Sequence, residues 1–307
     1  MSHLTRRRFL AIAAAAAAAT AGPARATPLY QWRGTALGAD ASITLAHEDA
    51  ESIVRDALRE IARLERIFSL HDSGSALVRL NRTGRLEAPP FELLECLSLC
   101  RGVNAATGGL FDPTIQPLWT LHAEHHAQGR SPDAAALAEA RARTGWSGLR
   151  FDTVGASLRE GMALSLNGVA QGYIADRVSD LLRARGLDKV LVNTGEFQAI
   201  GGQPAGGAWP ITLNDGEQHH TDAVMLENAA LASSSPHGIT FDAGGQVSHI
   251  LNPLTGQPAP ARWRLITVTA PRAALADALT TAFCLMDEDT ITATLRNFPQ
   301  ARLAHLG

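Results

Sequence analysis

Apolar and polar residues alternate with a helical period in several parts of the chain. Between Glu51 and Phe68, apolar side chains recur at steps of three and four residues, while Arg and Glu take the intervening positions. This period predicts one long amphipathic helix with an apolar stripe that faces a core. The same pattern, bounded by Gly and Pro, predicts further helices at 76–81, 90–104, 133–143, 170–185 and 273–286.

Short apolar runs separated by Gly, Asn and Asp turns dominate the chain from Leu149 onward. These runs predict strands at 149–152, 156–159, 163–166, 189–193, 209–213, 223–226 and 263–270. Residues 30–45 alternate around Gly34 and Gly38, which predicts two short strands or one bent strand. Helices grouped early and strands grouped late favour an α+β fold with antiparallel sheets over a doubly wound parallel sheet.

The first 26 residues have the pattern of an export signal. Arg6, Arg7 and Arg8 precede Phe9 and an Ala-rich run, and Ala24-Arg25-Ala26 has the small residues of a cleavage site. We interpret residues 1–26 as a twin-arginine signal peptide and residues 27–307 as the working domain, which we expect in the periplasm. An uncleaved membrane anchor and an ordinary secretory signal are the alternatives. The mature part contains no apolar run long enough to span a membrane.

Charge and composition exclude several classes of protein. The 307 residues are 46% hydrophobic and 19% charged, which is typical of a globular protein. Four of the 27 basic residues and none of the 30 acidic residues lie in 1–26, so residues 27–307 carry 23 basic against 30 acidic groups, a net charge of −7. We therefore expect no nucleic-acid partner. The three cysteines form no CxxC pair, and the GxGxxG, P-loop, GxSxG and HExxH motifs are absent.

Four polar stretches with small residues lie near the ends of predicted elements, at 108–114, 164–176, 248–258 and 276–282. A helix that opens after Asn167-Gly168 would point backbone N–H groups at an anion. Asp277 and Thr281 lie one helical turn apart, and such hard oxygen ligands suit a Mg²⁺ ion that bridges to a pyrophosphate. Read alone, this pair also fits a helix with an N-terminal charge and a core-facing hydroxyl.

Histidine clusters offer a second possible chemistry. His122, His125 and His126 lie near Glu124, and His219 adjoins His220. The spacing of the first group fits one helix face, but no further metal ligand is evident. We interpret that group as a solvated helix end.

Seven segments, in order, resemble the ApbE family of flavin transferases, which use FAD to attach FMN to a Ser or Thr of a protein. The first three are Gly34-Thr35-Ala36-Leu37-Gly38, the loop from Phe68 through Ser75 to Asn81, and Gly109-Leu110-Phe111-Asp112-Pro113-Thr114. The other four are Asn167-Gly168-Val169-Ala170 with Gly172, Tyr173 and Asp176; Val192-Asn193-Thr194-Gly195-Glu196; His249 with Pro253, Thr255 and Gly256; and Asp277-Ala278-Leu279 with Thr281. The resemblance covers nearly the whole mature chain.

The resemblance implies a T-fold-related α+β architecture, in which two intertwined subdomains and their flanking helices surround a flavin cleft. It implies that FAD is a substrate, that Asp277, Thr281 and the Gly168 carbonyl hold Mg²⁺, and that AMP leaves. Flavin contacts are implied for Leu37, His71, Leu110, Phe111, Asp112 and Leu251. We expect His249 to orient or deprotonate the hydroxyl of the acceptor, a membrane or periplasmic redox protein; alternatively, His249 caps the turn at Asn252-Pro253.

Four positions depart from the family pattern. Ser165 replaces an Asp, Gln171 a Lys, His71 an aromatic residue that is commonly Tyr, and Ala76 a Glu. Ser165 and Gln171 remain candidate cofactor-binding residues, although the exchange removes a pair of opposite charges. Two alternatives to transfer therefore stay open: a flavin carrier that binds FAD without transferring it, and an FAD pyrophosphatase that releases free FMN.

Overall fold

The computed structural model describes residues 27–214 and 223–307. A seven-stranded sheet forms its centre, with neighbouring strands antiparallel throughout and the order β1-β2-β6-β7-β10-β11-β12. The strands are β1 (Leu29–Ala36), β2 (Ala39–Ala46), β6 (Val190–Asn193), β7 (Phe197–Ile200), β10 (Ala230–Ser234), β11 (Ile266–Ala270) and β12 (Arg302–Leu306). The expected α+β fold with antiparallel sheets is confirmed.

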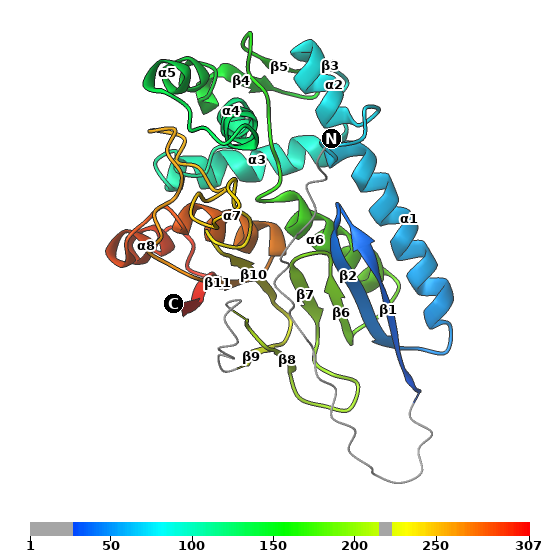
Figure 1. Ribbon diagram of the computed structural model, residues 1–307. Coiled ribbons are helices and arrows are strands. Elements are labelled where there is room, and N and C mark those ends of the chain that lie inside the picture. Colours follow the sequence, from blue (N-terminus) through cyan, green and yellow to red (C-terminus); the bar gives the residue numbers. More distant parts are fainter. Residues whose placement is uncertain (1–26, 215–222) are drawn as a thin grey trace.

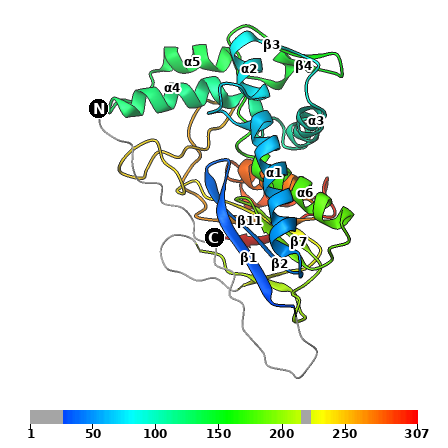
Figure 2. The ribbon, with the colours of Figure 1, turned by 90° about the vertical axis from the view of Figure 1, so that its right-hand side faces the viewer.

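Helices cover one face of this sheet (Figures 1 and 2). They are α1 (Ala50–Phe68), which packs on β1 and β2, α6 (Ala170–Ala184), which packs on β6 and β7, and α7 (Ala273–Phe283), which packs on β10 and β11. Val190 and Val192 of β6 are buried in the core beneath the helices. Leu191 between them faces the other way and packs with Trp209 and Ile211 of the two-stranded sheet β8 (Trp209–Ile211) and β9 (Val224–Leu226).

The remaining helices lie mostly beyond one end of the sheet, in the upper half of Figure 1. This half contains α2 (Ala76–Thr83), α3 (Phe91–Ala106), α4 (Gln116–Ala127) and α5 (Ala134–Ala142), together with a small sheet of β3 (Arg85–Glu87), β5 (Gly155–Leu158) and β4 (Leu149–Phe151). Helix α8 (Glu288–Leu295) follows α7 along the chain and precedes β12. The cleft described below lies where this helical half meets the large sheet.

The predicted strand at 163–166 is wrong. This segment forms no ladder, because its backbone hydrogen bonds go to other partners. Leu164 donates its N–H to Asn81 Oδ1 at 2.7 Å, the Leu164 carbonyl accepts from Asn81 Nδ2 at 2.8 Å, and Ser165 N–H donates to the Pro113 carbonyl at 2.8 Å. The apolar alternation reflects burial of Leu164 and Leu166 in an irregular segment that leads into α6.

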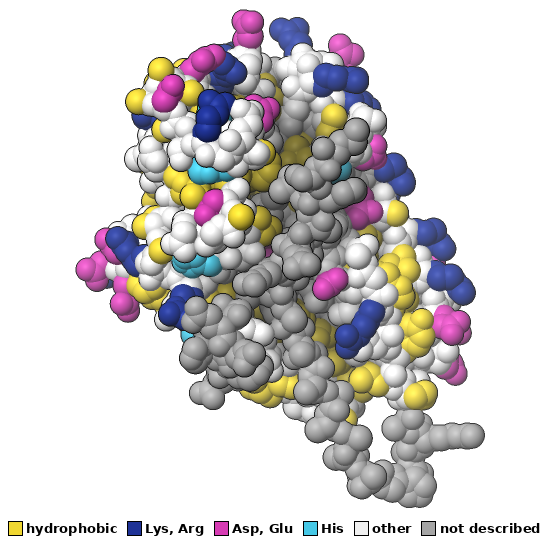
Figure 3. Space-filling view, viewed as in Figure 1, with side chains coloured by type: hydrophobic (Ala, Val, Ile, Leu, Met, Phe, Trp, Pro, Cys, Tyr) yellow, Lys and Arg dark blue, Asp and Glu magenta, His cyan; other side chains and the backbone are white. Residues whose placement is uncertain are grey.

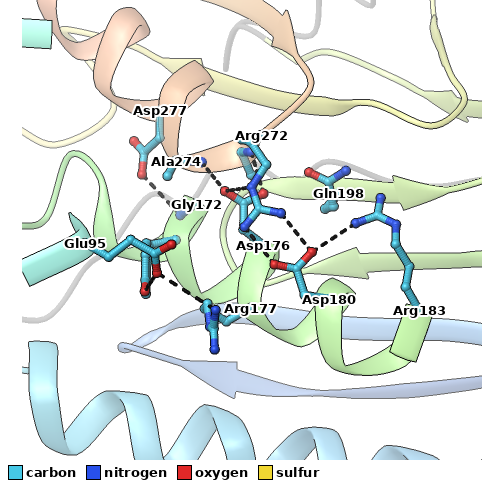
Figure 4. Close-up of polar contacts among 12 residues, drawn as sticks. Glu95, Gly172, Asp176, Arg177, Asp180, Arg183, Gln198, Arg272, Ala274 and Asp277 are labelled. Carbon is cyan, nitrogen blue, oxygen red and sulfur yellow. Dashed lines mark hydrogen bonds and ion pairs between the residues drawn. The ribbon is translucent and has the colours of Figure 1, made fainter. Parts of the chain in front are cut away.

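The start of α7 packs along α6 through a polar junction (Figure 4). Asp176 accepts hydrogen bonds from the N–H groups of Ala273 and Ala274, at 2.7 and 3.0 Å, and so satisfies donors at the first turn of α7. Arg272 holds Asp180 with two 2.8 Å hydrogen bonds. Gly172 lets the helices approach, since a Cβ there would lie 2.5 Å from the Ala273 carbonyl oxygen.

This close approach predicts a stability effect. Gly172→Ala should lower the free energy of unfolding by about 1–3 kcal/mol, because the added methyl must push α6 and α7 apart. Gly102→Ala is the matched control, because Gly102 is exposed on α3 and nothing lies within 4 Å of an added Cβ. The free energy of unfolding of this variant should rise by about 0.5–1 kcal/mol. Urea unfolding of both variants measures the difference, and equal effects would contradict the packing shown here.

No helix within residues 27–214 and 223–307 is long and apolar enough to cross a membrane. The predicted twin-arginine signal lies in 1–26, outside the described residues, so the division into 1–26 and 27–307 stays a prediction. On the face shown in Figure 3, charged side chains of the visible part lie mostly around the margin and form no single basic patch.

Candidate functional site

One cleft of about 700 Å³ brings most of the predicted site residues together. Its size falls within the range of ligand pockets. Strands β1, β2, β6 and β7 form one side, while the loop before α4, the start of α6, the loop after β10 and helix α7 form the others. Ten predicted residues line it: Leu110, Phe111, Asp112, Ser165, Gly168, Gln171, His249, Leu251, Asp277 and Thr281.

Asp277, Thr281 and Gly168 form an oxygen-rich corner of this cleft. Asp277 is 4% exposed, and its Oδ2 accepts one hydrogen bond, from Gly172 N–H at 3.3 Å. Burial raises the pKa of this carboxyl to about 7, and the nearby Asp176 charge adds to the rise. Thr281 lies one turn later on α7, and a Cβ on Gly168 would be 2.7 Å from Thr281 Oγ1. The α6 entrance therefore packs directly against this hydroxyl.

Divalent-cation chemistry fits this corner. Asp277 is a buried carboxylate without a cationic partner among the described residues, so a bound cation would supply the missing positive charge. Mg²⁺ binds one or two carboxylates and completes its coordination with other oxygens and with substrate phosphates. A carboxylate, a hydroxyl and a backbone carbonyl match that preference.

Glu196 is a cleft residue to which sequence reasoning assigned no role. It lies at the β6–β7 turn, is 8% exposed, and accepts a hydrogen bond from Ser233 N–H at 3.1 Å. Burial and the Asp277 charge raise its pKa well above the ordinary range. The Asn193–Glu196 segment belongs to one of the seven segments that resemble the ApbE family. That resemblance was the signal by which Glu196 could have been predicted as a site residue.

His249 lines the cleft from the loop that follows β10. Its Nδ1 lies 2.7 Å from the Ile239 carbonyl oxygen. Because a carbonyl only accepts, Nδ1 carries the proton in this hydrogen bond, and the neutral ring keeps Nε2 as a proton acceptor. The turn at Asn252-Pro253 is instead held by the Asn252 side chain, whose Oδ1 accepts from the N–H groups of Leu254 and Thr255. His249 therefore does not cap that turn.

Asp112 shapes the cleft wall. Its Oδ1 accepts from the N–H and hydroxyl of Thr114, at 2.9 and 2.7 Å, and its Oδ2 accepts from Trp146 N–H at 3.0 Å. Burial raises the pKa of Asp112, while these hydrogen bonds oppose the rise. They fix the loop that presents Leu110 and Phe111 to the cleft.

Gln171 and Ser165, two of the departures from the family pattern, both line the cleft. The Gln171 side chain lies against Gly195, where a Cβ would come within 2.7 Å of Gln171 Cδ, and Thr194 Oγ1 donates to the Gln171 carbonyl at 2.9 Å. Ser165 Oγ accepts from Asn167 N–H at 3.4 Å. Neither position carries a charge.

Leu37 and His71 are not among the residues that line the cleft. Leu37 lies in the β1–β2 turn, where its N–H donates to Glu65 Oε1 at 2.7 Å and its side chain packs against the core. His71 is exposed in the loop after α1, and its N–H donates to Ser69 Oγ at 3.1 Å. Their roles in flavin binding stay predictions.

The expectation of a solvated histidine group is wrong for His122. This residue is 3% exposed on α4, its Nε2 lies 2.9 Å from the Gly256 carbonyl oxygen, and its ring stacks on His126 and Phe241. The side chain joins α4 to the loop that carries His249. Within the described ranges no group of three or more His, Cys, Asp or Glu could hold a metal; His219 and His220 lie outside those ranges.

An α+β fold of antiparallel sheets, with an oxygen-rich corner and a histidine in one cleft, is the arrangement that the resemblance to the ApbE flavin transferases predicts. The chain matches the ApbE family over residues 37–304 and therefore belongs to that family. The predicted family and the class of enzyme, a transferase, are confirmed.

Relatives and solved structures agree with this assignment. An FAD:protein FMN transferase from Klebsiella pneumoniae (strain 342) is 27% identical to this chain, and the match covers 86% of this chain and 78% of the relative. An FAD:protein FMN transferase from Haemophilus influenzae is 28% identical, and the match covers 81% of this chain and 76% of the relative. The apo form of Pseudomonas stutzeri flavinyl transferase ApbE superposes with a TM-score of 0.80 at 25% identity, covering 92% of both chains. An ApbE protein from Thermotoga maritima gives 0.80 at 26% identity, covering 90% of this chain and 93% of its own.

Proposed function

We propose that this chain is a Mg²⁺-dependent FAD:protein FMN transferase that joins FMN to a Ser or Thr hydroxyl of an acceptor protein. The observation that carries the proposal is the meeting of Asp277, Thr281, Gly168 and His249 in one cleft of a chain that belongs to the ApbE family. The acceptor oxygen forms a bond to the FMN-side phosphorus of FAD, and the bond from that phosphorus to the bridging oxygen breaks. AMP leaves with that oxygen.

The residues divide this chemistry between two sides of the cleft. The Asp277 carboxylate, the Thr281 hydroxyl and the Gly168 carbonyl would hold Mg²⁺, which supplies positive charge for the pyrophosphate when it is bound. The start of α6 adds backbone N–H groups and a positive helix end beside this corner. His249 Nε2 accepts the proton of the acceptor hydroxyl, while the Ile239 carbonyl holds the ring in place through Nδ1.

The acceptor is proposed to be a membrane-bound or periplasmic redox protein. Support comes from the sequence of residues 1–26, which has the pattern of a twin-arginine signal. Because that route exports folded proteins, the transferase domain would work outside the cytoplasm.

Product analysis tests the proposal against its two alternatives. Purified protein is mixed with FAD, Mg²⁺ and a known flavinylated domain in its apo form, and AMP, free FMN and protein-bound flavin fluorescence are followed together. We expect AMP and flavinylated acceptor in equal amounts. Free FMN with AMP but no adduct would show a pyrophosphatase, and bound FAD without AMP would show a carrier; either result contradicts transfer.

His249 gives the reaction a predictable pH dependence. Burial lowers the pKa of its imidazole below the ordinary value of 6.5. The neutral form, which alone accepts a proton, is therefore populated at pH 7 and is lost only as the pH falls through the lowered pKa. Transfer rates measured from about pH 5 to 8 at saturating Mg²⁺, which would keep Asp277 ionised, should show an acidic limb with its midpoint below 6.5. A limb centred above 6.5 would contradict this role.

A further inference from the structure

Arg33 places an unneutralised positive charge in the cleft. It lies on β1 at one edge of the large sheet, is exposed, and lines the cleft. Its Nε donates to Gln31 Oε1 at 3.1 Å, which holds the side chain along the strand. No carboxylate of the described residues pairs with it.

Arg33 differs in charge from the other ionisable residues described around the cleft. Among the described residues that line the cleft, it is the only Lys or Arg. Four acids line the same space: Asp40, Asp112, Glu196 and Asp277. An anionic ligand that enters this cleft therefore meets one fixed side-chain cation from the chain itself.

Strand register places Arg33 on the same face of the sheet as Asn193 of β6. Arg33 is opposite Ser42 on β2, and Ser42 is opposite Asn193 on β6. Directly opposed residues of an antiparallel sheet lie on the same face. Two strand spacings separate the Cα atoms of Arg33 and Asn193 by roughly 10 Å. Because Arg33 is exposed, its side chain can leave Gln31 and extend across the small Ser42 side chain when a ligand binds.

Gln171 contacts the turn that follows Asn193. Its side chain lies against Gly195, and its carbonyl accepts from Thr194 Oγ1. The three residues Gly168, Val169 and Ala170 connect the oxygen-rich corner to Gln171 at the start of α6. The Asn193–Glu196 turn is therefore bordered by a neutral amide from α6 and is within reach of a guanidinium from β1.

We propose that Arg33 binds the pyrophosphate of FAD, supplying from β1 a positive charge that the Gln171 amide does not provide. The inference rests on the proposed function. A guanidinium presents a planar fork of N–H donors that matches phosphate oxygens, and such charge-assisted hydrogen bonds are strong. Arg33 is thus a substrate-binding residue, and a Mg²⁺ ion held by Asp277 would balance the rest of the negative charge of the pyrophosphate.

Binding titrations test this role without catalysis. Arg33→Gln should raise the Kd for FAD, measured by flavin fluorescence, by about 10- to 100-fold, and should leave the Kd for riboflavin, which has no phosphate, unchanged. Arg302→Gln is the matched control, since Arg302 is exposed on β12 at the other edge of the sheet and does not line the cleft. It should change neither Kd.

A second variant asks whether positions 33 and 171 serve the same phosphate group. In the Arg33→Gln background, Gln171→Lys should restore much of the lost FAD affinity. An unchanged FAD Kd in Arg33→Gln with a raised KM for the acceptor would overturn the proposal, because Arg33 would then bind the acceptor. Equal loss of FAD and riboflavin binding, or no recovery in the double variant, would also overturn it.

These outcomes are separable from failure of the proposed function. If the wild-type protein binds FAD through Arg33 but yields no flavinylated acceptor, the transferase proposal fails and the binding inference stands. If the wild-type protein transfers FMN and Arg33→Gln binds FAD equally well, only the inference fails.

Discussion

Asp277→Asn should lower the rate of FMN transfer by about 100- to 1,000-fold, and added Mg²⁺ should not restore it. Asp277 is the only charged group among the three proposed metal ligands, and the amide keeps its shape while removing its charge. The fold should survive, because Asn can still accept the hydrogen bond from Gly172 N–H. The variant also removes a buried carboxylate that has no cationic partner in the described part of the chain.

Two measurements check this result. Initial rates of acceptor flavinylation are followed across a Mg²⁺ titration, and Mn²⁺ binding is measured separately by electron paramagnetic resonance. Asp289→Asn is the control, since Asp289 is an exposed acid in the first turn of α8, and it should behave like the wild type. If Asp277→Asn transferred FMN at the wild-type rate and bound Mn²⁺ with the wild-type affinity, Asp277 would not be a metal ligand.

His249→Asn should lower the transfer rate by about 100- to 10,000-fold while leaving the Kd for FAD unchanged. The Asn side-chain amide can still donate to the Ile239 carbonyl as Nδ1 does, but no atom remains at the Nε2 position. The change therefore removes the proton acceptor and keeps the local hydrogen bond. It separates general-base catalysis from a role in holding the loop.

Single-turnover rates at saturating FAD measure this effect without the contribution of binding. His237→Asn is the control, because His237 is exposed in the same loop and does not line the cleft. The residual rate of His249→Asn should lack the acidic limb of the pH profile. A variant that transfers FMN at the wild-type rate would show that another group accepts the proton.

The proposed metal ligands were predicted from the sequence through the resemblance to the ApbE family, because the spacing of Asp277 and Thr281 alone fits a structural role equally well. Spacing showed only that Asp277 and Thr281 share a helix face and that Gly168 precedes a helix start. Their meeting could not be derived from spacing. It depends on the close approach of α6 to α7, which Gly172 permits and the Asp176 hydrogen bonds hold.

Other parts of the fold depend on tertiary contacts that local patterns do not contain. Strand β10 has the sequence Ala-Leu-Ala-Ser-Ser, without the β-branched or aromatic residues that indicate a strand, and it forms because β7 and β11 pair with both of its edges. The sequence analysis assigned no role to Arg33. Only the register across β1, β2 and β6 places it in the cleft.

FMN transfer by this protein is tested most directly by the intact mass of an acceptor domain incubated with the protein, FAD and Mg²⁺. We expect a mass increase of one FMN less one water, located by fragmentation on a single Ser or Thr. The increase should be absent without Mg²⁺, with Asp277→Asn, and when that acceptor residue is changed to Ala. An acceptor of unchanged mass, although the protein binds FAD and the acceptor is flavinylated by a related transferase, would contradict the account.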